Sequence, residues 1–186
     1  MALIKLIKDG YGQVELNNVA FRRDGRIEAQ CKLDEEDFAT IPAENGMLLM
    51  VDNVTRTVKL PEDETGKGLI ALNYSAEHLY DEKKEGLKNF KLERGTFLPR
   101  LGYLVNGDKF TTNAVIFEEG EDETVAAHLS AISAALKQGE KVTANPSTQG
   151  YIKVLSTHGL SGYLQVIEVT TMPDGQPALK FQVIGA

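Results

Sequence analysis

The stretch from Leu164 to Ile184 reads LQVIEVT, then TMPDGQP, then ALKFQVI, and it indicates the fold class. In its second arm every other residue is apolar and alternates with Lys180 and Gln182, which is the pattern of a strand with one buried face. Between the arms, Pro173-Asp174-Gly175 supplies residues that favour a tight reversal of the chain. The stretch therefore predicts an antiparallel hairpin.

Similar signals precede this hairpin along the chain. Arg26 to Leu33 alternates apolar and polar residues and, with Val19 to Phe21 before Asp24-Gly25, predicts a hairpin. Met47 to Val51 and Val54 to Leu60 flank Asp52-Asn53 and predict another. Its first arm is apolar on both faces and should be central in its sheet, whereas its second arm alternates and should be half-exposed.

A further hairpin is predicted around Asn106-Gly107, with Tyr103 to Val105 as one arm and Lys109 to Phe117 as the other. Tyr151 to Leu155 has the apolar alternation of one more strand. Two polar stretches, 61–68 and 139–150, are expected to be loops because they gather glycine, proline and charged or hydroxyl residues.

One helix is expected over 122–138. Val125, Leu129, Ile132 and Leu136 recur at helical spacing and make one apolar stripe. We expect Asp122 to be the N-cap and Gly139 to end the helix. A second, short helix is expected from Ser75 to about Glu85, with Leu79 as its anchor.

These patterns predict a mainly β (α+β) fold, namely a β-sandwich or barrel of short antiparallel strands and hairpins with one packed α-helix near 122–138. We expect residues 1–186 to form a single domain with an N-terminal arm at 1–10, and the acidic loop 61–68 is the alternative position for a boundary.

The composition excludes several classes of function. With a formal net charge of −7 and no basic stripe, direct nucleic-acid binding is not expected. No run approaches the roughly 20 apolar residues that a membrane span needs, and Met1 to Lys8 lacks the apolar core of a signal peptide. The lone cysteine, Cys31, lies in an alternating run and is expected to be a small buried residue instead of a nucleophile.

No motif for catalysis, a nucleotide or a cofactor is found, so no enzyme, cofactor or metal site is predicted. His78 could share a helix face with Asp81 and Glu82 as metal ligands, but a solvated surface is the favoured interpretation. His128 is expected at the edge of the helix packing surface, and His158 in a turn.

Carboxylates gather in three groups, which are 34–37, 62–64 and 118–123. A hydrolytic enzyme would need two of them to converge in a cleft. Their position in turns and beside the start of a helix favours solvated loop charge instead.

Three stretches resemble the small, β-rich auxiliary head proteins of tailed bacteriophages, which include capsid decoration proteins. Gly102 to Val115 resembles their Gly-Asp turn followed by a threonine-rich strand, and Gly162 to Ile184 resembles their closing hairpin. The middle block from Leu72 to Arg100 looks like phage structural-module sequence. The helix and this block make the chain larger than the simplest decoration proteins.

The resemblance implies a non-enzymatic virion protein that is assembled in the host cytoplasm, binds the major capsid protein and forms a homo-oligomer, with a trimer favoured. We expect the arm 1–8 to add as a strand to the sheet edge of a partner. The alternatives are a tail, connector or baseplate component, or a receptor- or glycan-binding module with an exposed cluster drawn from Tyr11, Tyr74, Tyr80 and Tyr103.

Overall fold

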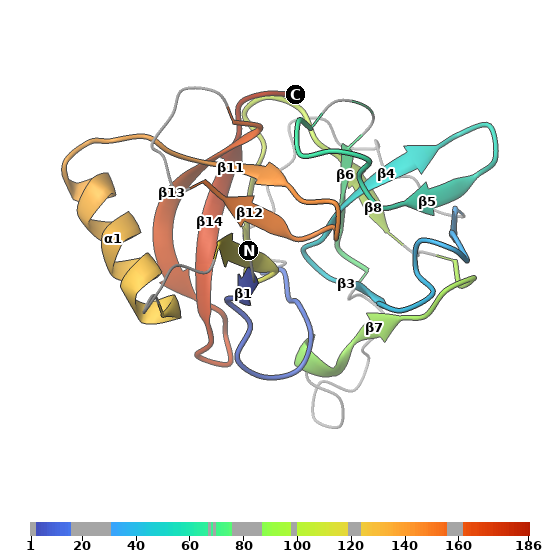
Figure 1. Cartoon of the computed structure of the whole chain (residues 1–186), viewed down its shortest axis with the longest axis horizontal. Helices are drawn as coiled ribbons and strands as arrows, with labels where there is room; N and C mark the ends of the chain where they lie inside the picture. The colour runs from blue at the N-terminus through green and yellow to red at the C-terminus, as the bar shows by residue number, and fades with distance from the viewer. Residues whose placement is uncertain are drawn as a thin grey trace.

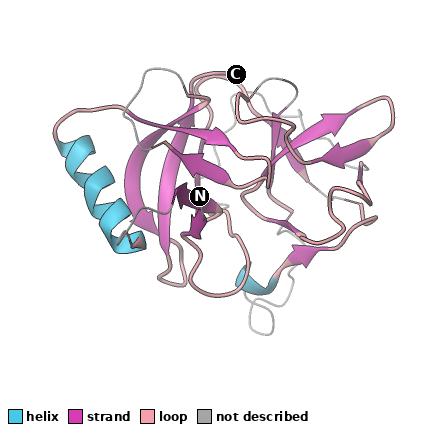
Figure 2. Cartoon of the chain, in the orientation of Figure 1, coloured by secondary structure: helices cyan, strands magenta, loops and turns pink. Residues whose placement is uncertain are grey.

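The computed structural model describes residues 3–15, 31–66, 68, 70–75, 87–97, 100–118, 124–155 and 162–186. In this part the chain is mainly β with one α-helix, which confirms the predicted fold class (Figures 1 and 2). The hairpin expected from Val19 to Leu33 and the short helix expected after Ser75 lie almost wholly outside the described residues.

The strands of the described residues form three sheets. The largest has seven strands, in the spatial order β1 (Leu3–Lys5), β10 (Val115–Glu118), β12 (Ile152–Val154), β11 (Val142–Pro146), β13 (Leu164–Thr171), β14 (Pro177–Val183) and β9 (Lys109–Thr112). The second has five, in the order β2 (Lys32–Leu33), β5 (Thr57–Lys59), β4 (Leu48–Asp52), β6 (Ile70–Asn73) and β8 (Leu101–Tyr103). The third pairs β3 (Ala43–Glu44) with β7 (Lys91–Leu92), which follows the 3₁₀ turn η3 (Leu87–Asn89).

The seven-stranded sheet curls back on itself. Strand β9 lies at one end of the strand order and β10 lies next to the other end, yet only Asn113 and Ala114 separate them along the chain. The segment 3–15 also contacts both ends of the sheet, because β1 pairs with β10 while Val14 bridges Thr112 of β9. The two ends of the sheet are therefore joined, which gives the sheet the character of a barrel.

Two of the expected hairpins are confirmed. Strands β13 and β14 pair antiparallel over their length, with a register shift between Val166 and Glu168. Strands β4 and β5 also pair, and β4 is central in its sheet as its apolar faces predict. The turn between β4 and β5 is longer than expected, since β5 begins at Thr57 and the residues before it form the turn.

The α-helix α1 (Val125–Lys137) covers β13 and β11 at one end of the molecule (Figure 1). Ile132 and Ala135 are buried, and the rest of the predicted stripe packs against the same core. The N-cap is Thr124 and not Asp122, because the Thr124 side chain accepts a hydrogen bond from the backbone N–H of Ala127. Gly139 follows the helix with a φ of 78°, as a C-terminal glycine is expected to do.

Three other expectations are wrong. The residues flanking Asn106-Gly107 do not pair with each other, because β8 belongs to the five-stranded sheet and β9 to the seven-stranded one. The expected loop 139–150 contains β11, which lies between β12 and β13. The sheets are also mixed and not purely antiparallel, since β10 pairs parallel with β12 and β2 pairs parallel with β5.

The hydrophobic core spans the two large sheets. One cluster joins the barrel strands and α1 to Leu48, Ile70 and Leu72 of the five-stranded sheet. The other joins that sheet to Ile116 and Tyr151. The stretch 61–68 connects β5 to β6, and both of these strands flank β4 in one sheet.

Candidate functional site

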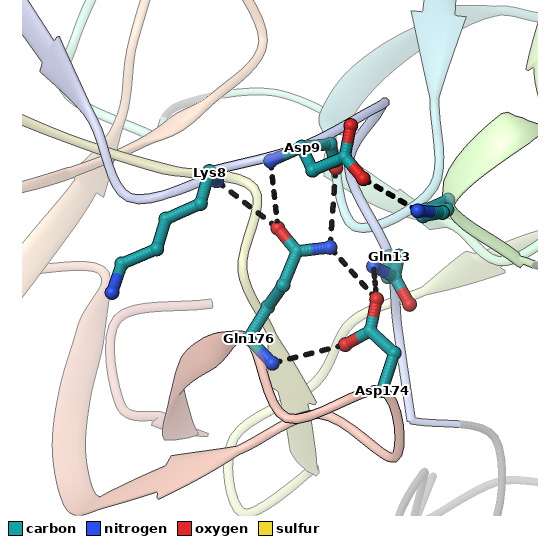
Figure 3. Close-up of polar contacts among 6 residues, drawn as sticks. Lys8, Asp9, Gln13, Asp174 and Gln176 are labelled. Atoms are coloured by element: carbon teal, nitrogen blue, oxygen red, sulfur yellow. Dashed lines mark hydrogen bonds and ion pairs between the residues drawn. The ribbon is translucent and has the colours of Figure 1, made fainter.

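The side-chain amide of Gln176 holds the N-terminal segment against the turn between β13 and β14 (Figure 3). Its Oε1 accepts hydrogen bonds from the backbone N–H groups of Lys8 and Asp9, each at 3.0 Å. Its Nε2 donates to the backbone carbonyl of Asp9 at 3.1 Å and to Asp174 at 2.7 Å. Donor and acceptor of one amide are thus both used to bind the same segment.

Neighbouring side chains extend this contact. Asp174 also accepts a hydrogen bond from Gln13 Nε2 at 3.0 Å, and Asp9 pairs with Lys88. Burial would raise the pKa of Asp174, but its hydrogen bonds from Gln176 and Gln13 outweigh burial and lower that pKa. Asp174 therefore serves as a fixed hydrogen-bond acceptor.

The expectation of an arm at 1–10 that adds to a partner's sheet is corrected for the described part of that segment. Leu3 to Lys5 form β1 in the chain's own sheet, and Leu6 is fully buried in the core. Of the apolar residues that suggested an arm for a partner, Leu6 is therefore used for internal packing, while Leu3 stays 38% exposed.

A second contact joins three parts of the chain through Tyr151. Its hydroxyl donates to Glu44 Oε1 at 2.6 Å and accepts from Lys5 Nζ at 2.6 Å. The other oxygen of the buried Glu44 accepts from the backbone N–H of Gly12 at 2.6 Å. Burial, followed by the nearby Glu44 carboxylate, raises the pKa of the Tyr151 phenol, so the hydroxyl keeps its proton and remains a donor.

A close backbone approach brings the loop after β3 against the bend between β9 and β10. Gly46 has a φ of 85°, and a side chain at this position would place its Cβ 1.9 Å from Thr112 Oγ1. The hydroxyl of Thr112 is itself used, because it donates to the carbonyl of Gln13 and accepts from the N–H of Ala114. Beside this contact, the side-chain amide of Asn45 and the Nδ2 of Asn113 are buried without a hydrogen-bond partner among the described residues.

Of the histidines and the cysteine considered in the sequence analysis, Cys31 and His128 lie in the described part of the chain. Cys31 is buried in the second core cluster, as predicted. His128 lies at the edge of the helix packing surface, as predicted, and its ring stacks on Phe117 with centroids 4.6 Å apart. His78, Asp81, Glu82 and His158 lie outside the described residues.

Several of the described carboxylates have structural partners. Asp37 accepts from the backbone N–H of Leu60, and Asp34 accepts from two N–H groups of its own turn. Lys153 pairs with Glu64 at 3.0 Å and Glu118 at 2.9 Å, which ties the 61–66 loop to the barrel. Within the described ranges, no three His, Cys, Asp or Glu side chains are grouped so that they could hold a metal ion.

The aromatic cluster expected for a glycan-binding surface does not form among its described members. Tyr74 is buried, with 7% of its surface exposed, and Tyr11 and Tyr103 are half-buried. Tyr80 lies outside the described residues.

An open cleft of about 380 Å³ lies beside the five-stranded sheet and is lined by Lys32, Thr55, Arg56 and Phe97. Sequence reasoning did not identify it, because Phe97 reaches β2 only through an isolated bridge to Lys32. The signal available in the sequence was the Asp52-to-Arg56 turn, whose Asp52 accepts N–H bonds from Val54 and Thr55. Hydrogen bonds from Thr55 lower the pKa of Asp52 and keep it an acceptor.

Comparison of the chain with protein-family models, curated proteins and solved structures gives no match. Among the described helices, none has the length and apolar character needed to cross a membrane.

Proposed function

We propose that this protein is a non-enzymatic structural component of a virion, which binds and stabilises the head of a tailed bacteriophage. The observation that carries the proposal is the set of hydrogen bonds that Gln176, Glu44 and Tyr151 make across the fold. Gln176 and the Glu44–Tyr151 pair bind segments that are far apart in the chain, and their hydrogen-bonding atoms are directed at the chain itself. This is the arrangement expected of a body that must keep its shape under load.

The partner in this proposal is the major capsid protein, and the binding form is a homo-oligomer, with a trimer favoured. Several copies acting together let modest single contacts add up to durable attachment. A head-stabilising protein must also stay in solution before it binds, and a net charge of −7 supports that property. The protein would be found on the virion after assembly in the host cytoplasm.

The test is co-sedimentation of the purified protein with expanded capsids that lack it, together with light scattering to measure the mass of the unbound protein. Saturable binding at a regular number of copies per capsid is the expected result. Purified tails are the comparison particle. If the protein binds tails and not capsids, the proposal is wrong and the protein is a tail, connector or baseplate component instead. Binding to neither particle would reject both.

A further inference from the structure

Phe97, one of the large apolar side chains exposed in the described part of the chain, lines the open cleft, and Val54 directly precedes the lining residue Thr55 in the sequence. Phe97, which lines the cleft, is 63% exposed, and Val54, in the turn that carries Thr55 and Arg56, is 93% exposed. Ligand sites are commonly lined by an aromatic side chain together with a few polar or charged groups. This surface lies at the end of the molecule opposite α1, near the β4–β5 turn (Figure 1).

The same cleft carries positive charge on an acidic protein. The guanidinium of Arg56 is exposed and forms no hydrogen bond or ion pair with the described residues. Lys32 pairs with Glu35 at 3.5 Å, and both side chains are well exposed. Exposed pairs of this kind contribute little to stability, so Lys32 can exchange Glu35 for a ligand carboxylate at small cost.

The backbone holds Arg56 in place. Its φ of 57° lies in the left-handed region, which a residue with a long side chain rarely adopts. Its carbonyl accepts a hydrogen bond from Lys32 N–H at 3.0 Å, and the preceding residues are fixed by Asp52. The guanidinium therefore projects from a turn that is rigid at its base, which reduces the entropy lost when a ligand binds.

The position of Phe97 is fixed in a similar way. Leu33 N–H donates to the carbonyl of Thr96 at 2.9 Å, and Gly95 N–H donates to the carbonyl of Leu33 at 3.1 Å. These bonds hold residues 95–97 along β2, so that an aromatic ring and two cations border one open space.

We infer that this cleft binds a peptide segment in which a carboxylate side chain neighbours an apolar one. Arginine recognises a carboxylate through two parallel hydrogen bonds, and the exposed ring of Phe97 offers a surface for the apolar neighbour. A volume of about 380 Å³ suits a short run of side chains. The inference goes beyond the proposed virion role and is independent of it, because it depends only on the cleft.

The test uses the full chain labelled with ¹⁵N and an unlabelled, acetylated and amidated hexapeptide of alternating glutamate and leucine. Saturable shifts of the backbone amides of Lys32, Arg56 and Phe97 are expected, and they should weaken as salt is added. The same peptide with glutamine in place of glutamate should bind at least about tenfold more weakly, as expected for the loss of charge-assisted hydrogen bonds.

Two variants and a control locate the site. Arg56→Asn removes the charge and suits the left-handed backbone, so the fold should be kept while binding falls about tenfold or more. Phe97→Ala removes an exposed ring and should also weaken binding. Lys141→Gln removes an exposed positive charge beside β11 and should leave binding unchanged.

The inference is overturned if the three amides do not shift at millimolar peptide, or if Arg56→Asn and Phe97→Ala bind as the unaltered protein does. Tighter binding of a hexamer of thymidylate than of the peptide would also overturn it, since the ligand would then be a nucleic acid.

Discussion

The hydroxyl of Tyr151 lies 2.6 Å from Oε1 of Glu44, and this hydrogen bond joins the seven-stranded sheet to the small β3–β7 sheet. The two residues are 107 positions apart, and Lys5 approaches the same hydroxyl from β1. A single phenol thus connects three elements whose relative positions no local signal determines.

Replacing Tyr151 by phenylalanine should lower the free energy of unfolding by about 1–3 kcal/mol, because the buried Glu44 loses a hydrogen-bond donor. Urea denaturation measures this change. Tyr103→Phe is the control, since the Tyr103 hydroxyl lies at the surface and 3.4 Å from Asn53, and it should change stability by less than about 0.5 kcal/mol. Equal effects of the two substitutions would contradict the structural role of the Tyr151 hydroxyl.

Stability should fall in alkaline solution. Burial raises the pKa of the phenols of Tyr151 and Tyr163, and Glu44 and Asp108 respectively add to the effect. Above the unfolded pKa of about 10 the unfolded chain loses these protons while the folded chain keeps them, so unfolding becomes easier as the pH rises. The loss should approach about 1.4 kcal/mol per pH unit for each phenol.

Urea denaturation from about two pH units below to about one and a half above the phenol pKa of about 10 measures this slope, and ultraviolet absorbance reports phenol ionisation. Two of the six tyrosines should ionise only when the protein unfolds. Ionisation of all six in the folded protein near pH 10 would refute the expected shifts.

Replacing Gln176 by glutamate keeps the acceptor for the N–H groups of Lys8 and Asp9 but removes the donor to Asp174. Two carboxylates would then face each other, so we expect a loss of about 2–3 kcal/mol at neutral pH that shrinks as the pH is lowered. Hydrogen exchange at Lys8 and Asp9 should become faster. Gln149→Glu, at an exposed position, is the control and should leave both measurements unchanged.

Two glycines with similar backbone angles should respond differently to alanine. Both Gly46 and Gly139 have a positive φ, which costs an alanine about 1–2 kcal/mol. At Gly139 the new Cβ has nothing within 4 Å, whereas at Gly46 it would lie 1.9 Å from Thr112 Oγ1. Gly46→Ala should therefore cost about 2–5 kcal/mol, with overpacking added to strain. Equal melting temperatures of the two variants would contradict the close approach at Gly46.

Leu6→Ala should destabilise the protein by about 2–5 kcal/mol, because Leu6 is fully buried in the core. Leu3→Ala, three residues earlier and 38% exposed, should cost less than about 1 kcal/mol. Deletion of residues 1–10 should therefore impair folding itself. A truncated protein as stable as the full chain would contradict the position of β1 in its own sheet.

Sequence patterns contained within one short stretch correctly predicted the hairpin and the helix formed by that stretch. The hairpin from Leu164 to Val183 follows from alternation and a turn within one stretch, and α1 follows from a stripe within 13 residues. The predicted N-cap is two residues too early, because Asp and Thr are both N-cap residues and the sequence pattern alone does not distinguish Asp122 from Thr124.

The nonlocal features were not predictable in the same way. The Asn106-Gly107 pair indicates a tight turn but not the partners of its two flanks, and they join different sheets. Strand β11 contains Asn145 and Pro146, which are depleted in strands, and its pairing with β12 and β13 makes it a strand. The cleft at Arg56 and Phe97 likewise depends on a pairing that brings together residues far apart in the sequence.

The bond between Lys8 and Gln176 spans 168 positions, so the ribosome must add those residues before the N-terminal segment can dock. At about 5–20 residues per second, this delay is roughly 10–30 s, during which Leu3, Ile4, Leu6 and Ile7 have no barrel to enter. Lys5 and Lys8 interrupt this apolar run with charge, as residues that guard nascent chains against aggregation do. In the finished fold, the Lys5 side chain then bonds Tyr151 and the Lys8 backbone N–H bonds Gln176.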